Sequence, residues 1–131
     1  MTGYAPSEIT VSTATAVTDG GAVETVIVSS KPVYTPGPGA TVSLFGVVNI
    51  TTGTAGTAVV VTLRRGSTTA GAVVGTATTD TTTAADHYTI PFEFVDEPGD
   101  VADLVYSVTV TETAATADGT VNYASLGGFI S

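Results

Sequence analysis

Four acidic side chains close together in the sequence are the residues best suited to holding a metal ion. Asp96, Glu97, Asp100 and Asp103 surround a proline–glycine pair, which is typical of a turn. Calcium prefers several oxygen ligands from loop carboxylates and carbonyls, but this spacing does not match an EF-hand loop. We therefore expect a solvated turn and no cofactor. The alternative is a calcium site, with Asp96, Asp100 and Asp103 as the candidate metal ligands.

The only histidine is another side chain suited to acid–base chemistry. His87 follows Asp86, but no nucleophile motif such as G-x-S-x-G accompanies them, and strand alternation places His87 on a polar face. Glu93 and Glu112 would suit a hydrolase if the fold brought the two carboxylates together. The chain has no tryptophan and few side-chain amides with which to line a sugar-cleaving cleft. We therefore expect a surface histidine and no enzyme.

The charge balance and the absence of cysteine exclude several classes of function. Three basic residues stand against twelve acidic ones, a formal net charge of −9, so we expect neither nucleic acid nor a membrane as partner. The lack of cysteine excludes disulfides and zinc–thiolate sites. The first residues show no signal peptide, and no apolar run is long enough to span a membrane. The glycosylation sequon at Asn49 is therefore treated as accidental.

Arg64 and Arg65 form the only basic pair in the chain. In so acidic a protein each guanidinium is stabilised by pairing with carboxylates, either within the subunit, which we favour, or across an interface. Successive residues of a strand point to opposite faces, so the two side chains are expected to serve different purposes. Both are candidates for an interface between subunits.

The elements that position these residues are predicted to be β-strands. The 131 residues fit one domain and include 27 threonines and 20 valines, with 15 glycines and 6 prolines between the strand patterns. No window shows the apolar stripe of an amphipathic helix. The pattern predicts an all-β fold, an antiparallel β-sandwich of the jelly-roll type with seven to eight strands. Residues 1–21 form either an N-terminal arm or a first strand, and residues 22–131 form the sandwich domain.

Alternation of side chains defines the core faces of two strands. The residues expected to face the core are Tyr88, Ile90, Phe92 and Phe94 in one strand and Leu104, Tyr106, Val108 and Val110 in the other. Pro91 cannot donate to a ladder, so its strand lies at a sheet edge or contains a bulge there. The turn signal between the two strands predicts a hairpin. Most tyrosines are expected on core-facing positions, with Tyr4 and Tyr34 as the exceptions.

Further strands are predicted at residues 23–29, 41–50, 58–63 and 120–126, and a weaker pattern predicts one at 71–79. Gly46 interrupts an otherwise apolar face and is interpreted as a bulge. The continuous apolar run 58–63 fits a strand covered on both faces or one that faces a neighbouring subunit. Residues 31–39 and 79–86 are expected to be irregular, and the proline-rich segment 31–39 to cross between sheets.

The apolar run 58–63 and the C-terminal segment 126–131 are more apolar than a small monomer comfortably exposes. Packing subunits against one another in a closed ring would cover both segments, so we expect a homo-oligomer. Phe129 and Ile130 are interface candidates, because their side chains can pack into a neighbouring subunit. The alternative is that they fold back on their own core.

Four segments, at residues 59–67, 88–92, 106–110 and 120–126, carry a resemblance to a known class of protein. Over roughly residues 40–131 the chain resembles the small β-sandwich or jelly-roll virion structural proteins of tailed bacteriophages, capsid decoration (cement) proteins in particular. The resemblance implies a homotrimer on the outer capsid surface that stabilises contacts between major capsid subunits and has no catalytic residues. The alternative is a cell-surface or phage-tail β-sandwich module that binds carbohydrate or a protein partner.

Overall fold

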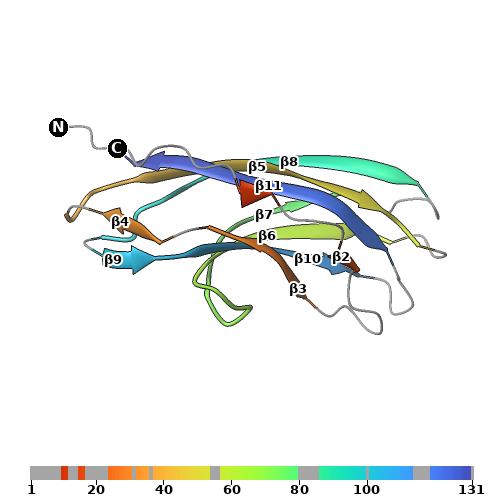
Figure 1. Cartoon of the computed structure of the whole chain (residues 1–131), viewed down its shortest axis with the longest axis horizontal. Coiled ribbons are helices and arrows are strands. Elements are labelled where there is room, and N and C mark those ends of the chain that lie inside the picture. The colour runs from red at the N-terminus through yellow and green to blue at the C-terminus, as the bar shows by residue number, and fades with distance from the viewer. Residues whose placement is uncertain are drawn as a thin grey trace.

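The structure of the protein is a computed structural model (Figure 1). In the part of the chain that it describes, the regular structure consists of β-strands and includes no helix. The structure describes residues 10–11, 15–16, 24–30, 32–35, 37–53, 57–79, 86–99, 101–113 and 119–130. The strands are β1 (Thr10–Val11), β2 (Thr15–Ala16), β3 (Thr25–Ser29), β4 (Val33–Thr35), β5 (Val42–Thr51), β6 (Val59–Arg65), β7 (Ala72–Thr78), β8 (His87–Asp96), β9 (Val101–Leu104), β10 (Tyr106–Glu112) and β11 (Thr120–Ile130). The all-β prediction is confirmed, and nothing helical in these ranges is long and apolar enough to cross a membrane.

Within the described ranges, seven strands of five or more residues form two antiparallel sheets that face each other as layers (Figure 1). The first sheet has the order β1-β11-β5-β8, with β2 also paired to β11, and the second has the order β3-β10-β6-β7. β4 and β9 pair separately as a two-stranded ribbon at one end of the molecule (Figure 1). The antiparallel sandwich predicted from the strand pattern is therefore confirmed.

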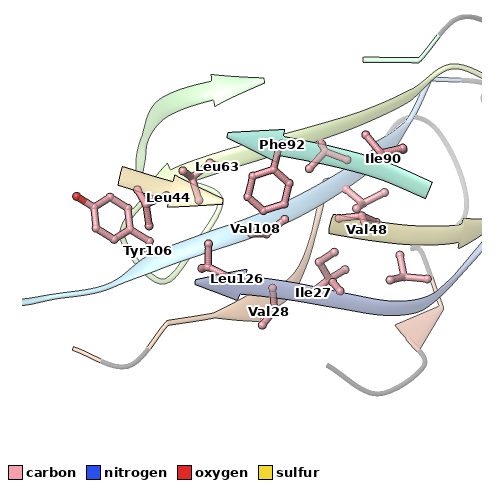
Figure 2. Close-up of a cluster of buried hydrophobic side chains, with 14 of the residues drawn as sticks. Ile27, Val28, Leu44, Val48, Leu63, Ile90, Phe92, Tyr106, Val108 and Leu126 are labelled. Carbon is pink, nitrogen blue, oxygen red and sulfur yellow. The ribbon is translucent and has the colours of Figure 1, made fainter. Parts of the chain in front are cut away.

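The core lies between the two layers, where alternate residues of β5, β6, β8 and β10 point inward (Figure 2). β-Branched and aromatic side chains pack well on such pleated surfaces, which is why a chain rich in threonine and valine forms strands. The eight core-facing positions predicted within residues 88–94 and 104–110 are all buried or packed against this core. Local alternation therefore identified the inner faces of β8 and β10 correctly.

The predicted hairpin between β8 and β10 is wrong, because these strands lie in different sheets. After β8 the chain forms β9, which pairs with β4, and then enters the second sheet as β10. A proline–glycine pair indicates a change of direction but carries no information about which strand receives the chain afterwards. The segment 31–39 contains β4, so it is not wholly irregular, and it crosses between sheets as predicted because β3 and β5 belong to different layers.

The edge prediction for Pro91 is confirmed, since β8 is the last strand of the first sheet. In the apolar run 58–63, Val59, Val61 and Leu63 are buried in the core and Thr62 is buried on the other face, whereas Val60 is partly exposed. Within residues 1–21, β1 and β2 pair with β11, and the other positions lie outside the described residues. Residues 80–85 of the second expected irregular segment also lie outside them.

Gly46 does not mark a bulge, because β5 pairs without a shift on both sides at this position. A Cβ here would overlap the carbonyl oxygen of Ser125 and lie 2.7 Å from Cζ of Phe92. A Cβ on Gly75 in β7 would likewise overlap the ring of Phe94, which stacks on Phe92 with 5.9 Å between ring centroids. The two glycines, one in each sheet, leave the space that this aromatic pair occupies.

Candidate interaction sites

Arg65, Asp96 and Tyr106 join the two sheets through a buried carboxylate. Asp96 Oδ2, at the end of β8, accepts hydrogen bonds from Arg65 Nε at 2.9 Å and from the Tyr106 hydroxyl at 2.7 Å. Arg65 belongs to β6 and Tyr106 to β10, so the contacts cross between the layers. Burial raises the pKa of Asp96, but the bonds from Arg65 and Tyr106 outweigh it and hold the pKa below its ordinary value.

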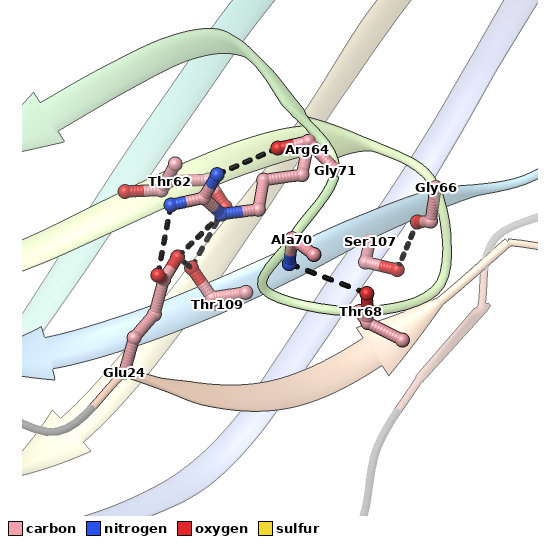
Figure 3. Close-up of polar contacts among 9 residues, drawn as sticks. All are labelled: Glu24, Thr62, Arg64, Gly66, Thr68, Ala70, Gly71, Ser107 and Thr109. Carbon is pink, nitrogen blue, oxygen red and sulfur yellow. Dashed lines mark hydrogen bonds and ion pairs between the residues drawn. The ribbon is translucent and has the colours of Figure 1, made fainter.

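A second ion pair ties the strands of the second sheet together on its outer face (Figure 3). Arg64 donates from Nε and Nη2 to the two carboxylate oxygens of Glu24, at 2.7 and 2.8 Å, and from Nη1 to the Gly71 carbonyl at 2.6 Å. The Thr109 hydroxyl also donates to Glu24. The Arg64 bond is the main reason that the pKa of Glu24 is lowered. Both arginines of the basic pair therefore bond within the chain and on different faces, as predicted.

Acid should weaken the fold through these two carboxylates. Glu24 and Asp96 both have a folded-state pKa below the ordinary values of 4.5 and 3.8. Each therefore contributes stability that is fully present above the ordinary pKa and is lost as the pH falls through the folded pKa. We expect the free energy of unfolding to decline below about pH 4.5, measured by urea denaturation at each pH. A Glu24→Gln, Asp96→Asn double variant should show a smaller decline, and an equal decline would contradict the assignment.

The structure assigns different environments to the candidate calcium ligands. Asp96 is buried in the contact with Arg65 and Tyr106, Asp103 is exposed in β9 with a φ of 55°, and Asp100 lies outside the described residues. In the ranges that the structure describes, no three His, Cys, Asp or Glu side chains are grouped to hold a metal ion. Sequence reasoning missed the structural role of Asp96, because Arg65 becomes its neighbour only when the sheets stack.

The fold does not bring together the two carboxylates proposed for a hydrolase. Glu93 is exposed on the outer face of β8, whereas Glu112 is buried at the end of β10, where it accepts the N–H of Gly119 at 2.7 Å. His87 is exposed at the start of β8, as predicted for a surface histidine. Its Nδ1 lies 2.8 Å from the hydroxyl oxygen of Thr51. Glu93 and Glu112 are therefore not placed as a carboxylate pair for glycoside chemistry.

Large apolar side chains are exposed at one end of the outer face of the first sheet. Phe129 of β11 and Val95 of β8 lie on either side of Ser43 in one cross-strand row and are 44% and 60% exposed. Phe45 in β5 is exposed in the next row, and we call Phe45, Val95 and Phe129 the apolar end. Ile130 folds back into the protein's own core, so of the two C-terminal interface candidates only Phe129 is accessible to a partner.

The opposite end of the same face carries polar side chains that bond across three strands. This polar row consists of Asn49 and Thr51 in β5, His87 and Thr89 in β8, and Asn122 in β11. Asn122 Nδ2 donates to Asn49 Oδ1 and to Thr51 Oγ1, both at 2.8 Å, and Asn49 Nδ2 donates to Thr89 Oγ1 at 3.0 Å. The side chain of the glycosylation sequon is thus bonded to both neighbouring strands of the sheet.

A β-bulge in β11 determines what surrounds the polar row. Asn122 is the extra residue, and the register with β5 shifts between Val121 and Tyr123. The shift moves the alternation by one position, so Val121 and Ala124 are buried while Tyr123 is 43% exposed. The expectation that Tyr123 faces the core is therefore wrong. Sequence alternation could not locate this bulge, because the extra residue is defined only by pairing with β5.

A shallow hollow lies between the apolar end and the polar row. It is lined by Phe45, Gly46 and Val47 of β5, Pro91, Phe92 and Glu93 of β8, and Ser125 of β11. Val47 lies two positions before Asn49 in β5, and Pro91 lies two positions after Thr89 in β8. The hollow therefore adjoins the polar row. The outer face of the first sheet is therefore a continuous surface with three parts.

No family model matches the chain, and no curated protein matches it in sequence. Its fold is similar to that of solved viral capsid chains. One chain from the infectious bursal disease virus Gt strain has a TM-score of 0.57 and 14% identity, covering 94% of this chain and 33% of that one. VP2 from an infectious bursal disease virus subviral particle has a TM-score of 0.52 and 13% identity, covering 95% and 36%.

This chain spans about a third of the length of those capsid chains. At such low identity the likeness concerns the fold alone. The protein therefore shares a β-sandwich fold with these two chains of infectious bursal disease virus.

Proposed function

We propose that this protein is a virion structural protein, a capsid decoration protein that binds the outer surface of a bacteriophage capsid as a homo-oligomer. The observation that carries the proposal is the fold, since 94% of the chain matches a viral capsid chain with a TM-score of 0.57. The resemblance of residues 40–131 to phage cement proteins supports the more specific decoration role. The partner would be the major capsid protein, and the protein would stabilise contacts between its subunits.

The apolar end of the first sheet supports a role in protein contact. Phe129 and Val95 expose apolar surface in one row, and Phe45 extends it into the hollow. Exposed apolar groups gathered on one face are typical of surfaces that bind protein. Aromatic side chains in such positions commonly contribute most of the binding free energy. We assign this end to the major capsid protein.

The charge of the chain supports an outer position on the capsid. A net charge of −9 repels packaged nucleic acid, whereas the outside of a capsid requires no contact with it. Self-association is supported by VP2, which has this fold and forms a subviral particle. We propose a homotrimer, and Arg65, whose side chain is 36% exposed beside Asp96, remains available to a neighbouring subunit.

Co-sedimentation with capsids tests the proposal. Capsids assembled from the proposed partner, a bacteriophage major capsid protein, should carry the purified protein into the pellet, and light scattering of the free protein should give the mass of a trimer. A Phe129→Ser, Val95→Thr variant should bind at least tenfold fewer copies because the apolar end loses its contact area. Tyr34→Ser, a matched change at an exposed aromatic of the ribbon, should bind normally.

Three results would each overturn a part of the proposal. The parent protein could remain in the supernatant at micromolar concentration, which would remove the capsid as partner. Alternatively, the Phe129→Ser, Val95→Thr variant could bind like the parent while circular dichroism shows it folded, which would remove the apolar end as the contact surface. A mass of one subunit by light scattering would reject the homotrimer.

A further inference from the structure

The few side-chain carboxamides of this protein and its one imidazole gather in one place. The sequence contains two asparagines, no glutamine and one histidine. Both asparagines and the histidine belong to the polar row, although they come from three different strands and positions 49, 87 and 122. Every side-chain carboxamide and imidazole in the chain therefore lies on one patch of the outer face of the first sheet.

The bonds within the polar row orient its unused hydrogen-bonding groups. Asn122 Nδ2 donates both of its hydrogens, so the amide is held in one orientation with Oδ1 left as an acceptor. Thr51 accepts from Asn122 and can donate its own hydrogen to His87 Nδ1, which leaves His87 Nε2 as an N–H donor. Asn49 keeps a second N–H and Thr89 keeps its hydroxyl hydrogen. Within the described residues these four groups have no protein partner.

The bulge adds an aromatic ring to this set of donors and acceptors. It places Asn122 and Tyr123 next to each other on the same outer face, where Tyr123 is exposed, although regular alternation would separate them. Tyr123 pairs with Asn49 across the strands, so its ring adjoins the amides. The hollow lined by Val47, Pro91 and Ser125 continues the surface in the next row. Bulges of this kind commonly re-aim side chains at functional sites.

We propose that the polar row and Tyr123 form a binding site for a neutral carbohydrate. Sugar hydroxyls both donate and accept, which matches the acceptor of Asn122 and the donors of Asn49, His87 and Thr89. An aromatic side chain with an apolar face and a polar tip suits the C–H face of a pyranose ring. No lysine or arginine belongs to the site, and the net charge of −9 repels anionic sugars, so we expect an uncharged ligand.

This site is separate from the surface assigned to the capsid. On β5, Phe45 of the apolar end and Asn49 of the polar row are four positions apart, which is roughly 13 Å along a strand, and the hollow lies between them. A decoration protein bound through its apolar end would leave the polar row free to contact a glycan. The two proposals therefore stand or fall independently.

Nuclear magnetic resonance of the full-length, ¹⁵N-labelled protein tests the site directly. The side-chain NH₂ signals of Asn49 and Asn122 are the only carboxamide signals that the protein can give, so they report on this site alone. The probes are galactose, N-acetylglucosamine, lactose and chitobiose, each titrated to tens of millimolar. We expect saturable shifts of both amide signals with at least one probe and a Kd in the millimolar range. Glucuronic acid should produce no saturable shift.

Variants locate the binding and separate it from capsid attachment. Asn122→Ala and Tyr123→Ala should each weaken the best sugar at least tenfold, as judged by the remaining NH₂ signal and by main-chain signals of β5. His87→Ala, at an exposed strand end, provides a second test if Asn122→Ala does not fold. Phe129→Ser should bind the sugar normally. Asn122→Ala should still co-sediment with capsids. A failure of the carbohydrate proposal can therefore be distinguished from a failure of the capsid proposal.

Three outcomes would overturn the carbohydrate site. The first is the absence of saturable shifts with all four neutral probes. The second is binding of glucuronic acid as tight as that of the best neutral sugar. The third is a sugar affinity that is unchanged both in Tyr123→Ala and in whichever of Asn122→Ala and His87→Ala is folded.

Discussion

Replacing Gly46 with alanine is expected to lower the free energy of unfolding by about 3 kcal/mol or more. The added methyl group would overlap the carbonyl oxygen of Ser125 and lie 2.7 Å from Phe92 Cζ. Overpacking a filled core usually costs about 1–3 kcal/mol, and here the backbone of β11 must move as well as a side chain. Urea denaturation followed by circular dichroism measures the loss.

A matched variant and a double variant show which contact limits the substitution. Ser43→Ala, on the outer side of the same strand, should change the stability by no more than about 0.5 kcal/mol. Phe92→Leu would shorten the ring but leave the Ser125 carbonyl in place. Gly46→Ala should therefore still cost most of its original amount in a Phe92→Leu background. Full recovery there, or a Gly46→Ala protein as stable as the parent, would contradict the assigned backbone contact.

Replacing Asp96 with alanine is expected to cost about 2–4 kcal/mol. The change leaves the buried Tyr106 hydroxyl without its acceptor and Arg65 without its counter-ion, and it removes the polar link between the two sheets. Breaking a buried ion pair by removing one partner typically costs about 3–5 kcal/mol, and partial exposure of Arg65 reduces that figure. Tyr106→Phe should cost less, about 1–2 kcal/mol, because only one hydrogen bond is lost.

The neighbouring acid provides the control for this prediction. Glu97 is exposed next to Asp96, so Glu97→Ala should leave the free energy of unfolding within about 0.5 kcal/mol of the parent. Comparable losses for Asp96→Ala and Glu97→Ala would show that local turn structure, and not the bond to Arg65 and Tyr106, is responsible. Thermal denaturation at neutral pH gives an independent measurement of the same difference.

Alternation along a single strand could be read correctly from the sequence. Tyr88, Ile90 and the following even-numbered residues of β8 all face the core, because consecutive side chains of a strand point to opposite sides whatever the strand pairs with. The edge position of Pro91 was also predictable, since a proline has no N–H to donate. Both conclusions depend only on the covalent geometry of the segment itself.

Pairing between distant segments could not be read in the same way. The proline–glycine pair after β8 predicted a hairpin, but β8 pairs with β5 and β10 pairs with β3 and β6. Gly46 interrupts an apolar face and so indicates a bulge, but the structure has none there, and the space it leaves is required by Phe92 on the neighbouring strand. The bulge that does exist, at Asn122, has no marker in composition or alternation. Each error concerns a contact between residues far apart in the chain.

The candidate carbohydrate site illustrates the same division. The sequence by itself determined that the protein is an all-β, acidic sandwich whose carboxamides and imidazole are few, because strand propensity, charge and composition are properties of residues taken singly or locally. Only the tertiary structure brought Asn49, His87 and Asn122 together and exposed Tyr123 beside them. The physical reason is that strand register is set by burial of the opposite face, so one extra residue in β11 reverses which side chains meet the solvent.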